Sequence, residues 1–251
     1  MSFQGKAVLI TGGATGIGKG IASHMGLLGA HVAICSRKQE ALQSACEELQ
    51  ALGIRAIAQP CDIRDPADVQ ATAAWVVTEF GSLDVLVNNA AGNFPALIEN
   101  LSYNGFKTVI DIDLNGTFNM TKACYDAWFK EHGGNIINIS APFEGAGIPY
   151  QAHAAAAKAG VNSLTRTCAV EWRKQGIRVN AIEPGAVDNT AGVDRLAASL
   201  TGSALVDVPP CTPTDIAKAV AFLASEEAAY INGQCIAVDS GTGVDLLKLN
   251  L

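Results

Sequence analysis

KAVLITGGATGIG, residues 6–18, is the stretch that decides the fold. Its apolar first half, 6–11, predicts a buried strand, and residues 17–28 follow with the pattern of a helix. Between them lie glycines, which allow a tight turn, while the start of a helix offers free N–H groups to a phosphate. A glycine-rich turn alone is weakly informative, but one placed between a strand and a helix predicts a dinucleotide-binding βαβ unit.

The rest of the chain repeats this alternation of strand and helix. Further strands, mostly continuous apolar runs typical of parallel strands buried on both faces, are expected at 31–36, 54–59, 83–88, 135–140, 177–182 and 234–239. Further helices are expected at 39–51, 66–80, 117–132, 154–173 and 214–224. The pattern predicts one α/β domain over residues 1–251, a Rossmann-type doubly wound parallel sheet with helices on both faces.

Composition narrows the classes of function. With 49% hydrophobic and 16% charged residues, the 251-residue chain can bury a large core. A net charge of −7 argues against nucleic acid as a partner, because phosphate backbones bind basic surfaces. The seven cysteines are odd in number and form no CxxC pair, so we expect free thiols and neither a metal site nor disulfides. No signal pattern or bilayer-length apolar run is found, so we expect a cytoplasmic protein outside the membrane.

The residues after the first two strands predict the cofactor. The phosphate-binding turn contributes Gly12, Gly16, Ile17 and Gly18. An NAD site usually has a carboxylate after the second strand, where it holds the ribose hydroxyls. This chain has Arg37 and Lys38 there, and a guanidinium suits a 2′-phosphate, so NADPH is favoured. The alternative interpretation is a solvated basic pair at the start of a helix.

The turn has the spacing Thr-Gly-x-x-x-Gly-x-Gly, which resembles the short-chain dehydrogenase/reductase superfamily. Segments that agree in order along the whole chain are Asp62-Ile63, Asn88-Asn89-Ala90-Ala91-Gly92, Lys158 and Pro184-Gly185. The resemblance implies that Asp62 and Ile63 contact adenine and that Asn89, Ala90 and Ala91 lie along the cofactor. It also implies that Lys158 holds the nicotinamide ribose and that Pro184 and Gly185 flank the nicotinamide.

The catalytic positions depart from the superfamily pattern. The superfamily's tyrosine, four residues before the lysine, falls on Ala154; its serine falls on Ala141 and its asparagine on Asp113. Of these four positions only the lysine is retained. Tyr150 is interpreted as a loop aromatic, and His153 either titrates near neutral pH or simply begins a helix. An ordinary alcohol dehydrogenase is therefore disfavoured, because alanine cannot act as an acid at a carbinol oxygen.

These departures resemble the 2,4-dienoyl-CoA reductases, particularly the peroxisomal type. The segments that carry this resemblance are Gly92-Asn93-Phe94, Asp111-Ile112-Asp113, His132-Gly133-Gly134 and His153-Ala154. That branch also lacks the tyrosine before the lysine and has an aspartate in place of the asparagine. The mitochondrial type uses a tyrosine fifteen residues before the lysine, where this chain has Phe143.

The resemblance implies an unsaturated fatty acyl-CoA substrate, reduced with NADPH in fatty acid β-oxidation. The implied substrate contacts are Asn93 and Phe94 at the thioester and acyl chain, and Arg64, Ser102 and Arg195 at coenzyme A. Asn93 can equally be a turn residue. As catalytic residues we expect Asn93 to stabilise the thioester oxygen, Lys158 to hold the ribose, and Asp113 with Lys158 to hold a proton-donating water.

Two alternatives and two structural expectations remain. The alternatives are a trans-2-enoyl-CoA reductase and a non-catalytic NADP-binding regulator. The irregular segment 185–213 is expected to form a substrate-binding lid, because ligands lie beyond the carboxyl ends of the strands. The resemblance implies a homotetramer assembled through the helices expected at 117–132 and 154–173.

Overall fold

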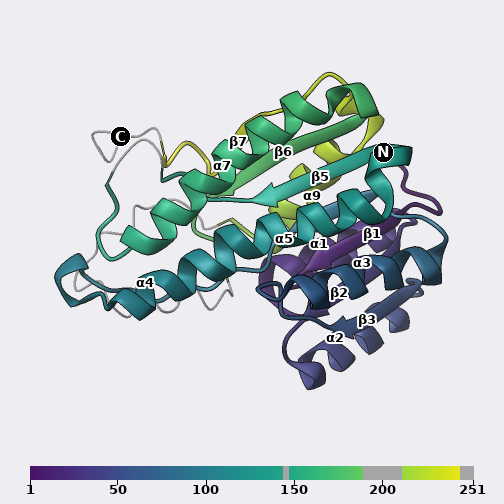
Figure 1. The fold of residues 1–251 in the computed structure, drawn as a ribbon. Helices are drawn as coiled ribbons and strands as arrows, with labels where there is room; N and C mark the ends of the chain where they lie inside the picture. The colour runs from purple at the N-terminus through teal and green to yellow at the C-terminus, as the bar shows by residue number, and fades with distance from the viewer. Residues whose placement is uncertain (144–146, 189–210, 244–251) are drawn as a thin grey trace.

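One parallel sheet forms the centre of the computed structural model, which describes residues 1–143, 147–188 and 211–243 (Figure 1). Its strands lie in the order β3-β2-β1-β4-β5-β6-β7. Their bounds are β1 Ala7–Thr11, β2 His31–Ser36, β3 Ala56–Pro60, β4 Val85–Asn88, β5 Gly134–Ile139, β6 Ile177–Pro184 and β7 Cys235–Val238. The order reverses between β1 and β4, and ligands of such sheets bind beyond the strand ends at this point.

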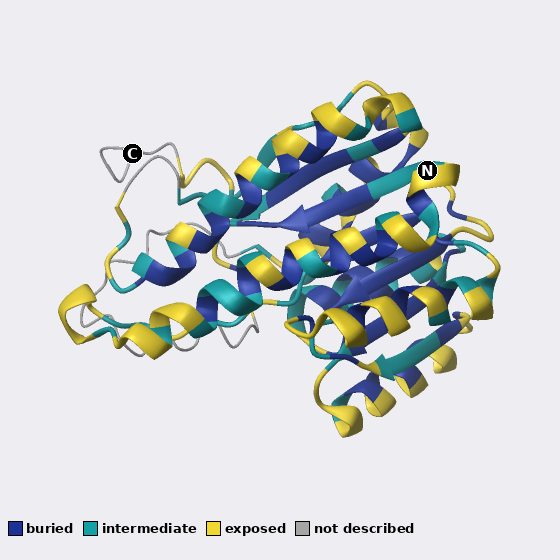
Figure 2. Cartoon of the chain, in the orientation of Figure 1, coloured by how far each residue is buried: buried dark blue, intermediate teal, exposed yellow. Residues whose placement is uncertain are grey.

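Helices cover both faces of the sheet. They are α1 Gly16–Leu27, α2 Gln39–Ala51, α3 Pro66–Phe80, α4 Tyr103–Ile110, α5 Gly116–Cys124, α6 Lys130–His132, α7 Ala152–Trp172 and α9 Pro213–Ala224. In β1, Val8 and Ile10 pack in the core with α1, α2 and α9, whereas Leu9 packs in the core with α3, α5 and α7. The strands are therefore buried on both sides and the helices expose only their outer faces (Figure 2). The predicted doubly wound α/β fold is confirmed.

One helical segment was not predicted. The expected helix at 117–132 is the second half of a longer helical run that begins with α4 at Tyr103. Two π-helical turns, Asp111–Asn115 and Tyr125–Phe129, interrupt this run. The sequence of α4 does not predict a helix, because Gly105 lies within it and two aspartates follow it. Glycine and aspartate both have low helix propensity. The cap is visible only in the structure, where the Ser102 hydroxyl accepts the Gly105 N–H at 3.0 Å.

All seven cysteines are free, and five of them are buried. Among the described residues, no helix is both long enough and apolar enough to cross a membrane.

Buried polar side chains connect the strands and helices that end at the site. The Asn88 amide of β4 donates to Asn138 Oδ1 of β5 and to Thr121 Oγ1 of α5, each at 2.9 Å. The Asn138 amide in turn donates to Thr165 Oγ1 of α7 at 2.8 Å. All four side chains are buried. Because a buried amide is costly unless paired, this network fixes β4 and β5 against α5 and α7.

We predict that Asn138→Ala lowers the free energy of unfolding by about 1–3 kcal/mol, because it removes one of the two acceptors of the buried Asn88 amide and the donor to Thr165. Urea unfolding measures the change. The matched control is Asn104→Ala on the exposed side of α4, which should change stability by no more than about 0.5 kcal/mol. Equal effects of the two substitutions would contradict a stabilising role for the network.

Candidate active site

The turn after β1 requires glycine at three positions. Gly12 and Gly16 have φ values of +65° and +53°, in the left-handed region that favours glycine. A Cβ atom at Gly18 would collide with the Gly12 carbonyl oxygen and the Asn89 amide nitrogen. Thr15, at the N-cap of α1, makes no side-chain hydrogen bond to the helix. The cradle therefore fits a pyrophosphate bound at the start of α1, beside the predicted contact Ile17.

Hydrogen bonds tie this turn to the end of β4. The Asn89 amide donates to the carbonyl oxygens of Thr11 and Gly12, at 3.0 and 3.2 Å. The Thr11 hydroxyl accepts the backbone N–H groups of Asn89 and Ala90, each at 3.0 Å. A Cβ atom at Gly12 would lie 2.9 Å from Ala90 Cα. Asn89 and Ala90 thus lie against the glycine-rich turn, and Ala91 follows them along the chain.

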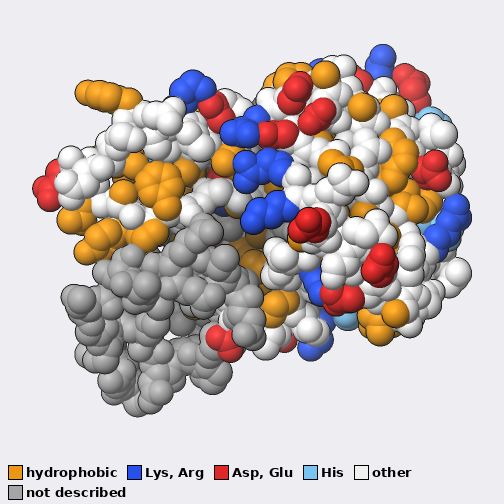
Figure 3. All heavy atoms as spheres, turned by 90° about the horizontal axis from the view of Figure 1, so that it is seen from below, with side chains coloured by type: hydrophobic (Ala, Val, Ile, Leu, Met, Phe, Trp, Pro, Cys, Tyr) orange, Lys and Arg blue, Asp and Glu red, His pale blue; other side chains and the backbone are white. Residues whose placement is uncertain are grey.

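Basic side chains meet a carboxylate where β2 and β3 end. Both oxygens of the Asp62 carboxylate accept the single N–H of Arg64 Nε, at 2.9 and 3.1 Å, and Oδ2 also accepts a hydrogen bond from Arg64 Nη2. These bonds lower the pKa of Asp62, and the charge of Arg37 contributes to the same shift. Arg64 was predicted to contact coenzyme A, but the structure places it beside Asp62 and Arg37, which were predicted to contact adenine and the 2′-phosphate. Seen from below, Lys and Arg side chains gather in the middle of this face, several beside acidic ones (Figure 3).

The other predicted cofactor residues lie at or just after the carboxyl ends of β2, β3 and β6. Lys38 is exposed at the N-cap of α2. Ile63 packs closely on Gly116, where an added Cβ atom would collide with the Ile63 side chain. Pro184 ends β6, and the Gly185 N–H donates to the Val238 carbonyl at 3.0 Å. Of the segment predicted as a lid, residues 189–210 lie outside the described part of the chain, and Arg195 is among them.

Asp113 and Lys158 form the buried polar centre of the site. Asp113 is 1% exposed, and its carboxylate accepts the Gly92 N–H at 2.7 Å. Lys158 Nζ of α7 lies 3.8 Å from Asp113 Oδ2 and donates to the Ile139 carbonyl at the end of β5, at 2.8 Å. The pair therefore stands beyond β4 and β5, between the long helical run and α7.

The environment of Asp113 favours its protonated form. Burial raises the pKa of its carboxyl above the ordinary value, because a charge loses hydration in the interior. The Lys158 ammonium lowers the pKa, as do the Gly92 N–H and His153, but they do not cancel the effect of burial. Asp113 therefore holds a proton to higher pH than an exposed aspartate does, which suits a group that takes part in proton transfer.

The three positions that carry hydroxyls in related enzymes have none here. Ala154 is buried in the first turn of α7, and Ala141 and Phe143 are half-buried after β5. The neighbouring Ser140 hydroxyl is buried and donates to the Lys158 carbonyl oxygen at 3.3 Å. No side chain at positions 141, 143 or 154 can therefore exchange a proton with a substrate oxygen.

The segment after β4 lies against the start of α7 through three contacts. The Asn93 amide donates to Gln151 Oε1 at 2.6 Å. The ring of Phe94 packs edge to face on His153, with 4.6 Å between centroids. The Ala96 N–H donates to the carbonyl oxygen of Tyr150, whose φ of +67° is rare for a non-glycine residue. We call these pairings the 93–96/150–153 contact; they fix Asn93 and Phe94 beside the Asp113–Lys158 pair.

Apolar side chains are exposed on the other side of this contact. Phe94 is 39% exposed, and the segment that follows it adds exposed side chains from Leu97, Ile98, Tyr103 and Phe106. Ser102, predicted for coenzyme A, caps α4 at the same place. A Cβ at Gly105 would lie 2.9 Å from the Phe94 ring, so α4 packs closely on the predicted acyl contact.

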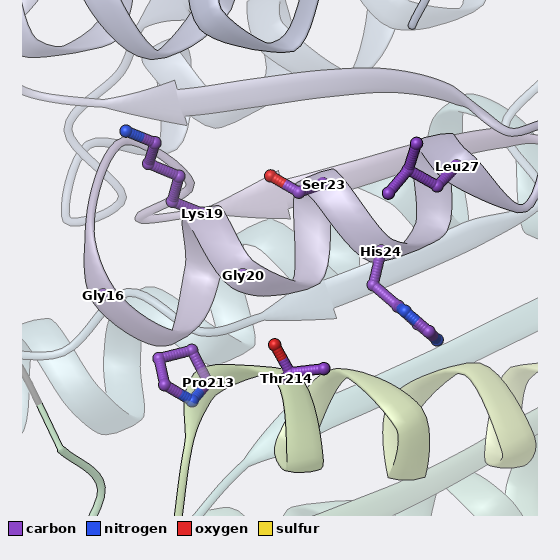
Figure 4. A pocket seen from close by; sticks show the side chains of 8 residues that line it. All are labelled: Gly16, Lys19, Gly20, Ser23, His24, Leu27, Pro213 and Thr214. Atoms are coloured by element: carbon purple, nitrogen blue, oxygen red, sulfur yellow. The ribbon is translucent and has the colours of Figure 1, made fainter. Parts of the chain in front are cut away.

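A separate pocket of about 450 Å³ lies between α1 and the start of α9 (Figure 4). Lys19, His24 and Thr214 are among its lining residues. It shares only Gly16 with the predicted cofactor contacts and includes none of the predicted catalytic residues. The pocket is therefore distinct from the Asp113–Lys158 centre.

Gln151 is a residue of the site that the sequence did not reveal. The residue is 2% exposed, and its Oε1 accepts the hydrogen bond from the Asn93 amide. Gln151 lies at the N-cap of α7. A glutamine before a helix has no local pattern that marks it as the partner of a side chain 58 positions away. His153 was considered as a titratable group or as the start of a helix, and the structure places it beside Phe94 in the site.

Known proteins resemble this chain over nearly its whole length. The family described as enoyl-(acyl carrier protein) reductase matches residues 12–243. A peroxisomal 2,4-dienoyl-CoA reductase of Rattus norvegicus is 41% identical, covering 97% of this chain and 86% of the relative. A probable 2,4-dienoyl-CoA reductase of Bacillus subtilis is 44% identical, covering 95% of this chain and 97% of the relative.

Solved structures agree. A short-chain dehydrogenase from Bacillus anthracis is 41% identical with a TM-score of 0.87, covering 96% of this chain and 97% of the other. An actinorhodin polyketide ketoreductase with NADPH is 30% identical with a TM-score of 0.90, covering 97% of this chain and 99% of the other. The predicted resemblance is confirmed, and the chain belongs to the enoyl-(acyl carrier protein) reductase family of the short-chain dehydrogenases/reductases.

Proposed function

We propose that this protein is an NADPH-dependent 2,4-dienoyl-CoA reductase, which reduces a carbon–carbon double bond of an unsaturated fatty acyl-CoA in β-oxidation. The observation that carries the proposal is the buried Asp113–Lys158 pair in a site without hydroxyls at positions 141, 143 and 154. Reduction of a ketone needs an acid at the carbonyl oxygen. Reduction of a conjugated thioester instead needs stabilisation of an enolate and a proton for carbon, and this site contains groups suited to both tasks.

The 93–96/150–153 contact supports the assignment of the thioester end. When NADPH is bound, it supplies the hydride. Addition of hydride to the far end of the diene leaves negative charge on the thioester oxygen, where a neutral donor stabilises it. The Asn93 amide donates to Gln151 Oε1 at 2.6 Å. Gln151 thereby orients the amide that we assign to this oxygen.

Asp113 and Lys158 are assigned to the proton. The pair lies 3.8 Å apart, a separation at which a water can bridge the carboxyl and the ammonium. Lys158 also holds the nicotinamide ribose in this proposal. Protonation of the dienolate at C2 gives a 3-enoyl product, and protonation at C4 gives a 2-enoyl product. The names of the relatives include both outcomes, (3E)-enoyl-CoA-producing in rat and (2E)-enoyl-CoA-producing in Bacillus subtilis.

Assembly and location are part of the proposal. A homotetramer through α5 and α7 is supported by Phe118 and Val170, which are 51% and 64% exposed on these helices. Tyr125 of the same helical run stacks on Trp172 of α7, with 4.4 Å between centroids, so aromatic side chains connect the two helices. A cytoplasmic location of the protein is consistent with its cysteine thiols, because a reducing compartment keeps thiols from forming disulfides.

The first test is an NADPH-oxidation assay across acyl-CoA thioesters. We expect oxidation with 2,4-dienoyl-CoA substrates and none with a ketone or a saturated acyl-CoA, with mass spectrometry locating the product double bond. Activity restricted to 2-enoyl-CoA would favour the trans-2-enoyl-CoA reductase alternative. NADPH binding without oxidation of any thioester would favour a non-catalytic regulator.

We predict that Arg37→Ala weakens NADPH binding by roughly tenfold to 150-fold, because about 1.5–3 kcal/mol of charged hydrogen bonding to the 2′-phosphate is lost. NADH binding should not change. Fluorescence titration with both cofactors measures the preference. The control is Arg55→Ala, whose guanidinium bonds the Glu79 carbonyl at the opposite end of β3. A wild-type protein with equal affinity for both cofactors would contradict the assignment of Arg37.

Asp113→Asn should lower turnover by about 10²–10⁴-fold and leave NADPH affinity nearly intact, because the amide accepts the Gly92 N–H but cannot carry the proton. Stability should change with pH in a defined direction. Since folding raises the pKa of Asp113, its contribution is full below the unfolded value near 3.8 and declines as pH rises.

Unfolding of both proteins in urea, from pH 4 to pH 8 by design, tests this sign. The stability difference should move in favour of Asp113→Asn as the pH increases. A destabilised Asp113→Asn protein with near-normal turnover would instead identify Asp113 as a scaffold residue.

A further inference from the structure

His153 is a fully buried side chain of the site to which the reaction outlined above gives no role. It is the second residue of α7 and immediately precedes Ala154, the position without a hydroxyl. Its ring packs edge to face on Phe94, with an interplanar angle of 79°. Asp113 is near enough for its charge to act on the imidazole. The side chain therefore lies between the predicted acyl contact and the buried carboxyl.

The hydrogen bonds of His153 define its tautomer. Nδ1 lies 2.8 Å from the backbone nitrogen of Ala154 and accepts that N–H. An accepting nitrogen carries no hydrogen, so the hydrogen of the neutral ring is on Nε2. Burial lowers the pKa of His153, and the Phe94 backbone and the Asp113 carboxylate only partly oppose this effect. The positive end of α7 also disfavours the imidazolium, so the ring is neutral at pH 7.

In this tautomer Nε2–H is a hydrogen-bond donor that lacks an acceptor among the described residues. It is buried from solvent and has no hydrogen-bond partner in the described part of the chain. A hydrogen-bond contact with the Phe94 backbone raises the pKa of His153, but no hydrogen bond of ordinary geometry is formed by Nε2 within the described residues. Buried donors are almost always satisfied, because an unmade bond leaves the cost of lost hydration uncompensated. An acceptor supplied by a bound ligand would remove that cost.

Building on the proposed reduction, we propose that His153 Nε2–H is a catalytic hydrogen-bond donor to the thioester oxygen of the substrate. Asn93 and Phe94, assigned to the thioester and the adjoining acyl chain, contact Gln151 and His153 respectively, so both donors belong to the 93–96/150–153 contact. The imidazole would supply, one residue earlier in α7, the oxygen-directed donor that Ala154 lacks.

The donor keeps its hydrogen throughout the reaction. A neutral imidazole is a very weak acid, so it stabilises the dienolate oxygen by a hydrogen bond without transferring a proton. The proton that reaches carbon still comes from the water assigned to Asp113 and Lys158. The site then separates two tasks: Asn93 and His153 act on the oxygen, and Asp113 with Lys158 acts on the carbon.

The test compares two substitutions that differ in the donor. His153→Leu removes the N–H and should lower kcat with 2,4-dienoyl-CoA by roughly 10²–10³-fold, the usual effect of losing one oxyanion donor. His153→Gln places an amide N–H near the Nε2 position and should recover most of that loss. NADPH affinity should be the same in both variants. His24→Leu, in α1, controls for loss of a histidine elsewhere and should retain full activity.

The outcomes separate this inference from the proposed function. If the wild-type protein reduces no unsaturated acyl-CoA, the proposed function is wrong. If it is active but His153→Leu keeps its kcat, or if His153→Gln loses as much as His153→Leu together with thermal stability, the ring only supports Phe94 and this inference is overturned.

A measurement on the unaltered protein does not depend on the variants folding. The chain has four histidines, and isotope-labelled histidine allows NMR to identify the tautomer of each ring. We expect one buried neutral ring with its hydrogen on Nε2 at pH 7. The resonance of that hydrogen should shift when NADP⁺ and an enoyl-CoA are added together. A charged ring, the opposite tautomer or an unaffected resonance would overturn the assignment.

Discussion

The hydrogen bond from the Gly92 N–H to the Asp113 carboxylate, 2.7 Å long, is the contact on which the rest of the site depends. Gly92 follows β4, Asp113 belongs to the long helical run, and the carboxylate lies 3.8 Å from Lys158 of α7. Three distant parts of the chain thus meet at one buried carboxyl. Burial favours the protonated carboxyl and these partners oppose that effect, so the fold around the site also determines its electrostatics.

The electrostatic design suits a reaction that forms negative charge on a substrate oxygen. The first turn of α7 directs its positive end toward the 93–96/150–153 contact, and Lys158 adds a full charge one turn later. These groups are fixed by Gln151 and by the Ile139 carbonyl before any substrate binds. Donors that are already in place need no reorganisation when charge develops, which is how they would stabilise the enolate in the proposed reaction.

The sequence predicted the features that local chemistry dictates. Gly12 and Gly16 could be assigned because a left-handed turn before a helix requires glycine, and the seven strands because buried parallel strands are continuously apolar. The link between Arg64 and Asp62 was not predicted, because the resemblance assigned each residue to a different ligand. Gln151 was missed because no periodicity encodes a contact between two loops; only packing brings it to Asn93.

The π-helical turn at Asp111–Asn115 makes the position of the Asp113 carboxyl depend on the number of residues in the helical run. Such a turn holds one residue more than an α-helical turn, and a helix rotates by about 100° per residue. Removing one residue there would yield a more regular helix, but it would rotate the residues on one side of the deletion by about 100° relative to those on the other side. Asp113 could then not stay beside Lys158 while α4 stays packed on Phe94. A relative that has lost a residue between Tyr103 and Cys124 would therefore keep the fold without the contact that Asp113 makes with Lys158 here.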